Sequence, residues 1–169
     1  MSTKRSITLL RGVFNDAFFD LLKEEKAKDI FVLEGRPRTD ATNAFLKELV
    51  KRKFTPTLIA DNMAGFLFYK DLVKEVWVSY QSLDKNGAFC DIGALILGVL
   101  GKAHKVPVYA FPSAEKLKAM GNPKEILKFN GKQIAPKGIR GHVPLVEYLP
   151  KKYITDVYTF ECECCSCEK

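Results

Sequence analysis

Short apolar runs alternate with amphipathic segments along the first two thirds of the chain. A short continuous apolar run is typical of a strand buried on both faces, whereas apolar residues three and four positions apart are typical of a helix. Strands are predicted at residues 6–10, 29–34, 55–60, 76–79 and 106–111. Helices are predicted at residues 13–25, 41–52, 63–69 and 93–103. The alternation predicts a Rossmann-like α/β fold: a doubly wound, mostly parallel sheet of five or more strands with helices on both faces.

The pattern becomes less regular beyond residue 113. A helix is predicted to reach residue 120, followed by a Gly-, Pro- and Lys-rich loop over residues 121–142 with room for a short β-pair. Late strands are predicted at residues 143–148 and 153–160. We therefore expect a single Rossmann-like domain over residues 1–160 and a cysteine-rich tail over residues 161–169.

Composition narrows the class of protein. With 169 residues and 47% hydrophobic content, the chain can bury the core of one domain. Charged residues interrupt the apolar runs before any reaches membrane-spanning length, so no membrane span is expected. The first residues lack the apolar core of a secretory signal, and a cytoplasmic protein is the resulting expectation.

Positive charge is concentrated in one segment. The formal net charge is +7, and residues 116–140 carry seven Lys and Arg against one acid, Glu125. Such a segment could bind RNA or a phosphorylated ligand. The alternative is a solvated, lysine-rich connection, which is favoured because no aromatic-rich nucleic-acid module accompanies the charge.

Four of the five cysteines lie in the last eight residues: Cys162, Cys164, Cys165 and Cys167. Cysteines confined to a tail do not build a disulfide framework for a core. Their thiolates could bind zinc or another soft metal, alone or shared across a dimer. A reduced or partly oxidised terminus without metal is the alternative.

Polar residues follow the second and third predicted strands, at the edge where open α/β sheets bind ligands. Arg36 precedes Pro37, which favours an extended backbone and could present the guanidinium to a phosphate. A structural pair of Arg36 with Asp61 or Asp40 is the alternative.

Two further pairs of residues are candidates at the same edge. Asp61 and Asn62 could contact a ligand, but capping of the helix that begins near residue 63 is the favoured role. Arg11 and Gly12 follow the first strand and could offer charge and close backbone to an anion. The sequence contains no phosphate-binding loop, complete dinucleotide fingerprint, Ser/His/Asp order or His-rich metal pattern.

Several segments occur in the order found in one superfamily. They are residues 34–37 (Glu-Gly-Arg-Pro), 58–65 (with Asp-Asn-Met-Ala-Gly), 86–87 (Asn-Gly), 92–93 (Ile-Gly) and 103–109 (Ala-His-Lys-Val-Pro-Val-Tyr). They resemble the carboxyl-terminal Rossmann-like domain shared by the regulatory α, β and δ subunits of translation initiation factor 2B, methylthioribose-1-phosphate isomerase and ribose-1,5-bisphosphate isomerase. The resemblance covers most of residues 6–160 and implies pairing through this domain, as a homodimer or with a related subunit. Apolar residues at positions 66–69 also predict an interface.

The resemblance also implies which catalytic groups have changed. In the isomerases a cysteine after the first strand and an aspartate after the fourth carry the aldose–ketose conversion. These positions fall on Leu10 or its neighbour and on Gln81, which cannot shuttle a proton near neutral pH. The phosphate-binding Asn-Lys-Ile-Gly of the family is similar to residues 90–93, where Gly93 is kept but Asp91 would repel a phosphate. Since few residues precede the first strand, we also expect the family's amino-terminal helical domain to be absent.

Three functions remain open. The first is a non-catalytic ligand-binding or assembly protein, with a phosphorylated sugar or nucleotide as candidate ligand. Its candidate ligand-binding residues are Arg36, Arg11, Gly12, Asp61, Asn62, Gln81 and Gly93. The second is an isomerase-like enzyme with a divergent active site, in which Asp61 is the acid or base. The third is a metal- or redox-responsive protein acting through its cysteine tail. Loss of both catalytic positions favours the first.

Overall fold

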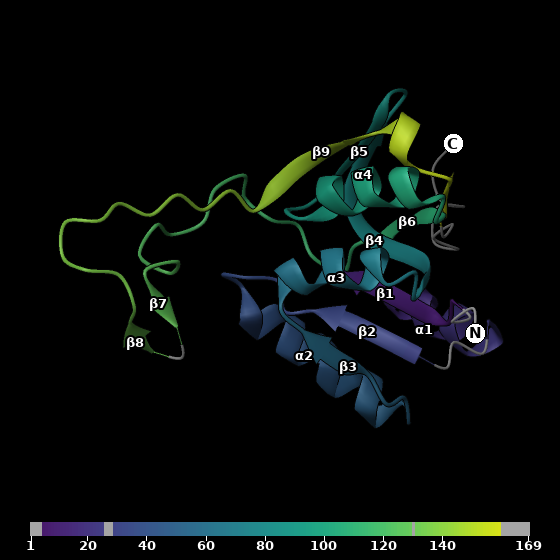
Figure 1. Ribbon diagram of the computed structural model, residues 1–169, viewed down its shortest axis with the longest axis horizontal. Coiled ribbons are helices and arrows are strands. Elements are labelled where there is room, and N and C mark those ends of the chain that lie inside the picture. Colours follow the sequence, from purple (N-terminus) through teal and green to yellow (C-terminus); the bar gives the residue numbers. More distant parts are fainter. Residues whose placement is uncertain (1–4, 26–28, 130, 160–169) are drawn as a thin grey trace, which may run out of the picture.

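The computed structural model describes residues 5–25, 29–129 and 131–159. Within these residues eight strands form one sheet, six of them in the order β10-β6-β4-β1-β2-β3 with every neighbouring pair parallel. These strands are β1 (Ile7–Arg11), β2 (Asp29–Leu33), β3 (Thr57–Ile59), β4 (Val73–Asp84), β6 (Val108–Pro112) and β10 (Asp156–Val157). The predicted Rossmann-like, mostly parallel α/β fold is confirmed (Figure 1).

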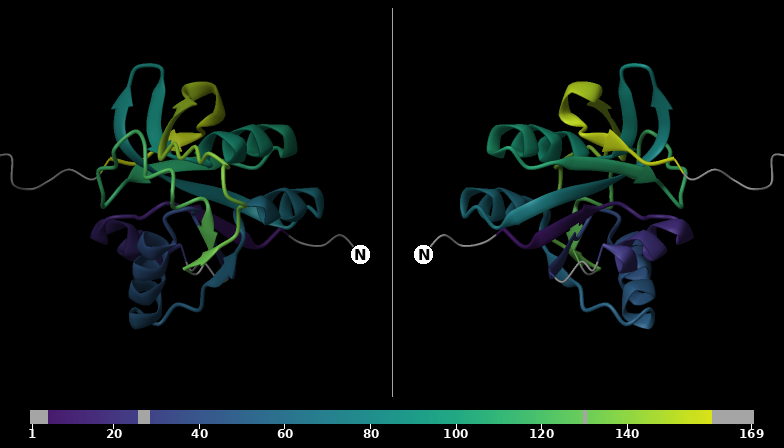
Figure 2. Two further views of the ribbon diagram at one scale, coloured as in Figure 1. Left: turned by 90° about the vertical axis from the view of Figure 1, so that its left-hand side faces the viewer. Right: turned by 90° about the vertical axis from the view of Figure 1, so that its right-hand side faces the viewer.

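Helices cover both faces of the sheet, as Figure 2 shows edge-on. On one face are α1 (Asp16–Glu24) and α2 (Thr39–Lys51), and on the other are α3 (Ala64–Tyr69) and α4 (Ala94–His104). The strands supply both cores because successive side chains point to opposite faces. In β1, Leu9 packs in the core of α3 and α4, whereas Leu10 packs in the core of α1 and α2.

An antiparallel extension, which the apolar pattern did not predict, grows from the central strand β4. The chain turns back after β4 into β5 (Gly87–Asp91), and β9 (Val146–Pro150) pairs antiparallel with β5. The carboxylate of Asp84 stabilises the turn, because Oδ1 accepts hydrogen bonds from the amides of Asn86 (2.7 Å) and Gly87 (2.9 Å). Asn-Gly is typical of tight turns between antiparallel strands.

The predicted helix after residue 113 is wrong. The chain there forms isolated bridges, Phe14 with Ser113 and Met120 with Pro144. Glu115 N donates to Ser113 Oγ (3.1 Å), but Leu117 N, which a helix would bond to the Ser113 carbonyl, donates to Gln81 Oε1 (2.7 Å). An acceptor from a distant side chain therefore replaces a helical hydrogen bond at this point.

Two smaller expectations concern edges and loops. The strand predicted at residues 55–60 is not buried on both faces: Leu58 is 49% exposed, because β3 is an edge strand and the helices on that face leave it open. The loop over 121–142 does contain a short β-pair, β7 (Lys128–Phe129) with β8 (Lys132–Gln133). Short 3-10 helices precede α3 and follow β9: η1 (Asp61–Met63) and η2 (Lys151–Tyr153). No helix in the described residues has the length and hydrophobicity to cross a membrane.

Candidate functional site

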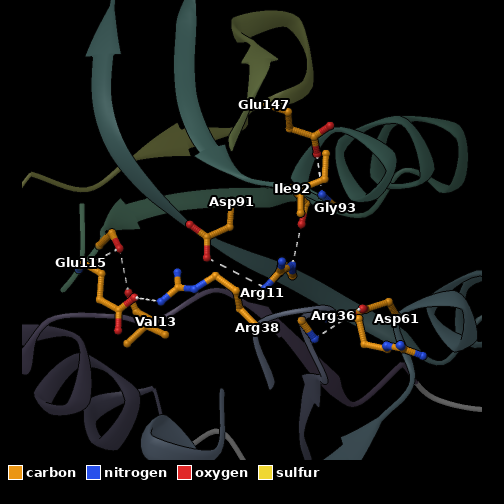
Figure 3. Close-up of polar contacts among 12 residues, drawn as sticks. Arg11, Val13, Arg36, Arg38, Asp61, Asp91, Ile92, Gly93, Glu115 and Glu147 are labelled. Atoms are coloured by element: carbon orange, nitrogen blue, oxygen red, sulfur yellow. Dashed lines mark hydrogen bonds and ion pairs between the residues drawn. The ribbon is translucent and has the colours of Figure 1, made fainter. Parts of the chain in front are cut away.

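Arg11 lies at the centre of the carboxyl edge of the sheet, because it ends β1, whose neighbours are β2 and β4. The side chain is buried, with the residue only 6% exposed. Its Nε donates to the carbonyl of Ile92 (2.8 Å), and Nη1 lies 3.9 Å from Asp91 Oδ2 (Figure 3). The structure thus makes Arg11 an internal partner of the loop after β5.

Asp91 reaches this edge because the β4–β5 hairpin turns the chain back beside Gln81. Burial raises the pKa of the Asp91 carboxyl, and the nearby Arg11 opposes that shift only in part. The amide of Gln81 also favours the ionised form, although neither Gln81 Nε2 nor Asp91 Oδ1 makes a hydrogen bond of ordinary geometry. A buried carboxyl of this kind is a candidate for proton transfer or for ligand contact.

Two glycines make room for the Arg11 guanidinium. Both have left-handed backbones, with φ +70° at Gly35 and +102° at Gly93. A Cβ on Gly35 would lie 2.8 Å from Arg11 Nη1, and one on Gly93 would lie 3.1 Å from Nε. Gly93 was a candidate ligand contact, but the close approach that it permits in this structure is to Arg11.

Asp61 binds backbone amides of the neighbouring loop. Its Oδ1 accepts from Gly35 N and its Oδ2 from Arg36 N, each at 2.9 Å. The favoured capping role is wrong, because neither η1 nor α3 has a side-chain cap and the Asn62 side chain is exposed. The carboxylate instead joins the ends of β2 and β3.

The side chain of Arg36 contacts the segment 116–140, which we call the basic arm. Its Nη2 donates to the carbonyl of Lys128 (3.1 Å), and its guanidinium carbon lies 4.7 Å from the ring centroid of Phe129. The alternative pairing of the Arg36 guanidinium with Asp61 or Asp40 is not observed. Arg36 and Arg11 therefore have separate partners, although both follow strands at this edge.

Glu147 is a functional candidate that the sequence analysis missed. From β9 its Oε1 accepts from Gly93 N (2.6 Å) and Leu95 N (2.8 Å), the free amides at the start of α4. A helix amino terminus of this kind favours an anion, and here the chain's own carboxylate occupies it. The available signal was Gly93 itself, because a glycine N-cap has no side-chain oxygen and leaves these amides to a distant acceptor.

Little space is left around Arg11. The cavity there has a volume of about 10 Å³, room for about one water molecule. It adjoins an open groove of about 590 Å³, with which it shares Pro37, Arg38 and Leu117. Arg38 binds Glu115 (2.7 Å), and Lys116 and Lys118 also line the groove.

Leu10 and Gln81, which the resemblance places at the catalytic positions of the isomerases, have no side-chain group that transfers protons near neutral pH. Leu10 is fully buried in the core of α1 and α2. Gln81 uses Oε1 to accept the amide of Leu117. In the part of the chain that the structure describes, the one free cysteine is Cys90, where burial strongly raises the pKa of the thiol.

A family model described as the Initiation factor 2 subunit family matches residues 8–160. The chain belongs to this family. A family member from Thermus thermophilus, named methylthioribose-1-phosphate isomerase, is 31% identical over 160 residues, which cover 88% of this chain and 48% of that protein. A putative methylthioribose-1-phosphate isomerase from Methanosarcina acetivorans is 29% identical, over 82% of this chain and 42% of that protein. The chain thus spans about half the length of the curated relatives that it matches.

Two solved structures have the same fold. Translation initiation factor eIF-2B subunit delta from A. fulgidus superposes with a TM-score of 0.75 at 18% identity, covering 93% of this chain and 52% of that one. 5-Methylthioribose 1-phosphate isomerase from Pyrococcus horikoshii gives 0.74 at 22% identity, covering 91% and 49%. The expected superfamily and fold are therefore confirmed.

The four tail cysteines predicted to bind metal lie outside the described residues. Among the residues that the structure describes, no group of three or more His, Cys, Asp or Glu side chains could hold a metal ion. Zinc or another soft metal at the tail stays a prediction.

Proposed function

We propose that this member of the initiation factor 2 subunit family is a non-catalytic binding and assembly module. One observation carries the proposal: the donors at the carboxyl edge are already paired with carbonyls and carboxylates of the chain itself. Asp61 binds two loop amides, Glu147 binds two amides of α4, and Asp91 lies beside Arg11. Together with a cavity of about 10 Å³, this arrangement leaves no room for a sugar phosphate at Arg11.

A small phosphorylated ligand has a better place in the adjoining groove. Its volume of about 590 Å³ lies in the range of small-molecule sites. Arg38, Lys116 and Lys118 bring positive charge to its walls, and Asp40 and Glu125 bring negative charge. A sugar phosphate or nucleotide would meet these cations first. Ligand contacts of Arg36, Asp61 and Gln81, which the sequence analysis proposed, stay a prediction. They would require a part of the ligand to extend from the groove to the carboxyl edge of the sheet.

Assembly is supported by an apolar surface on the outside of α3 and α4, which pack beside each other. We call it the α3/α4 face. Its exposed residues are Met63 (45%), Phe66 (55%), Tyr69 (77%), Ile96 (62%) and Val99 (43%). Apolar side chains gathered in this way usually mark a protein interface. A homodimer, or a pair with a related subunit, would bury them.

Light scattering tests the assembly. The wild-type chain should have a dimer mass at micromolar concentration, and Phe66→Glu combined with Ile96→Glu should give a monomer. Val50→Glu is the matched control, because Val50 is 61% exposed on α2, at the opposite face of the sheet. A monomeric wild-type chain, or equal dissociation by the control, contradicts the assembly part of the proposal.

The second candidate function is a sugar-phosphate isomerase with a divergent active site. Two observations favour it. A relative of which this chain matches about half the length is named an isomerase, and Asp91 has a buried carboxyl whose pKa is raised. Its test is conversion of methylthioribose-1-phosphate or ribose-1,5-bisphosphate to the ketose, followed by phosphorus NMR. Turnover that disappears in Asp91→Asn would overturn the non-catalytic proposal.

The third candidate function is a metal or redox response through the cysteine tail. The cytoplasmic location, a separate expectation, also stays a prediction. Metal analysis of the purified chain tests the tail directly. The wild-type chain should retain zinc that a variant with all four tail cysteines changed to serine loses. Equal metal content in both proteins would remove this candidate.

A further inference from the structure

Within the described residues, the cations of the basic arm have no acidic partners. Ion pairs among the described residues all involve cations outside the arm: Arg5, Arg11, Lys23, Arg38, Lys51, Arg52 and Lys74. The arm's seven Lys and Arg are exposed: Lys116, Lys118, Lys124, Lys128, Lys132, Lys137 and Arg140. Against the single acid Glu125 they give the segment a formal charge of +6, nearly the whole +7 of the chain.

The arm projects from the body on the side toward which β2 points, as Figure 1 shows. A solvated, lysine-rich linker would expose mainly polar side chains, but this segment also exposes apolar ones. They are Met120 (48%), Phe129 (41%), Ile134 (56%) and Ile139 (55%). Unpaired charge and exposed apolar side chains on one projecting segment indicate a binding surface and not a solvated linker.

An aromatic ring lies among these cations. Phe129 follows Lys128 in β7, and Lys132 of β8 lies directly opposite it in the pairing register. One side of the ring contacts the Arg36 guanidinium, while 41% of the residue remains exposed. Cations beside an accessible aromatic ring suit a single-stranded nucleic acid, because the cations can contact its phosphates and the ring can stack on one of its bases. An acidic polypeptide would use the cations but would leave the ring without a stacking partner.

We propose that the basic arm binds single-stranded nucleic acid, with its lysines on the phosphates and Phe129 stacking on a base. The ligand class is polyanionic and sequence-tolerant, because phosphate contacts and stacking carry no base code. This surface shares Lys116 and Lys118 with the candidate small-molecule groove, but Phe129 and the three lysines tested below do not line that groove. The inference therefore does not depend on the proposed non-catalytic role.

The test is fluorescence anisotropy of the full chain with a labelled uridine oligomer of about twenty nucleotides, long enough to cover one binding site. Binding should weaken steeply between about 50 and 200 mM salt. Lys124→Gln, Lys128→Gln and Lys132→Gln combined should weaken it about tenfold or more and reduce the salt slope by about 2. Phe129→Leu should weaken it about fivefold or more, because leucine keeps the apolar volume but removes the stacking ring.

The matched control removes three charges elsewhere, at Lys47, Lys85 and Lys151, which are exposed outside the arm. It should leave the salt slope unchanged. A deoxythymidine oligomer shows whether the 2′-hydroxyl matters, and tight binding of either polymer supports the proposal. Absent binding by the wild-type chain, equal losses in the two triple variants, an unaffected Phe129→Leu, or equally tight binding of polyglutamate would each overturn it.

Discussion

The carboxyl edge of the sheet and the basic arm both carry positive charge, but their charges have different surroundings. At the edge, Arg11 is buried, hydrogen-bonded to the Ile92 carbonyl and placed beside Asp91. On the arm, lysines such as Lys124 and Lys132 are exposed, and none has an acidic partner in the described residues. The edge has the position expected of a ligand site, and the arm has the unsatisfied charge.

This difference shows that topology and charge answer separate questions. An open α/β sheet brings its loops together at the carboxyl edge, whatever those loops then bind. Whether the edge receives a ligand depends on which donors remain free once the chain has folded. Here internal carboxylates occupy them, as Glu147 does at the start of α4. The following predictions test how strongly each region depends on its internal contacts, from the largest effect to the smallest.

Gly12→Ala should be the most destabilising change at the edge. Gly12 has φ +111°, and a Cβ there would lie 1.9 Å from Ser79 Oγ. Backbone strain and the clash together should cost about 2–5 kcal/mol of the free energy of unfolding. Gly138→Ala on the arm is the control, because Gly138 has φ +88° with nothing within 4 Å, and should cost only about 1 kcal/mol. Equal losses by urea denaturation would show that the edge is not closely packed.

Arg11→Met should lower the free energy of unfolding by about 3 kcal/mol, because it leaves a buried carboxylate without its cation. Adding Asp91→Asn should restore about 1–3 kcal/mol, since the neutral amide no longer needs that partner. Lys128→Met on the arm should change stability by less than about 0.5 kcal/mol. Additive losses at Arg11 and Asp91 in the double-mutant cycle would show that the two residues are not coupled.

Glu147→Ala should cost about 1–2 kcal/mol, because two amides at the start of α4 lose their acceptor. If Glu147 occupies an anion site, added sulfate should raise the Tm of this variant more than that of the wild-type chain. Glu125→Ala is the control, because Glu125 is exposed on the arm. A sulfate response equal in all three proteins would argue against an occupied anion site.

Asp91→Asn should have the smallest effect, and that effect should depend on pH. Since burial raises the pKa of Asp91 above its ordinary value of 3.8, the folded protein holds this proton more tightly than the unfolded chain. Asp91 therefore lowers stability as pH rises through the window between the two values. The stability of Asp91→Asn relative to wild type should increase with pH across that window and then level off. A difference that does not vary with pH in denaturation curves would contradict the raised pKa.

Much of the fold could be predicted because side-chain periodicity is a local property. The alternation of Leu9 and Leu10 between two cores follows from strand geometry alone. The hairpin from β4 into β5 was not predicted, because its two strands lack a clear apolar alternation. Asn86-Gly87 was the local sequence signal for its turn. The helix expected after Ser113 failed because Gln81, far away in the sequence, supplies an acceptor to Leu117 N.

The sequence by itself determined the α/β alternation, the family, the absence of a cysteine at or beside Leu10 and the concentration of charge on residues 116–140. Only the tertiary structure decided which charges remain free. Asp91 lies beside Arg11 and Glu147 caps α4 because a hairpin and a distant strand carry them there. The spacing of residues along the chain determines in which direction each side chain points within one helix or strand. It does not determine which distant carboxylate will lie beside a given amide or guanidinium in the folded protein.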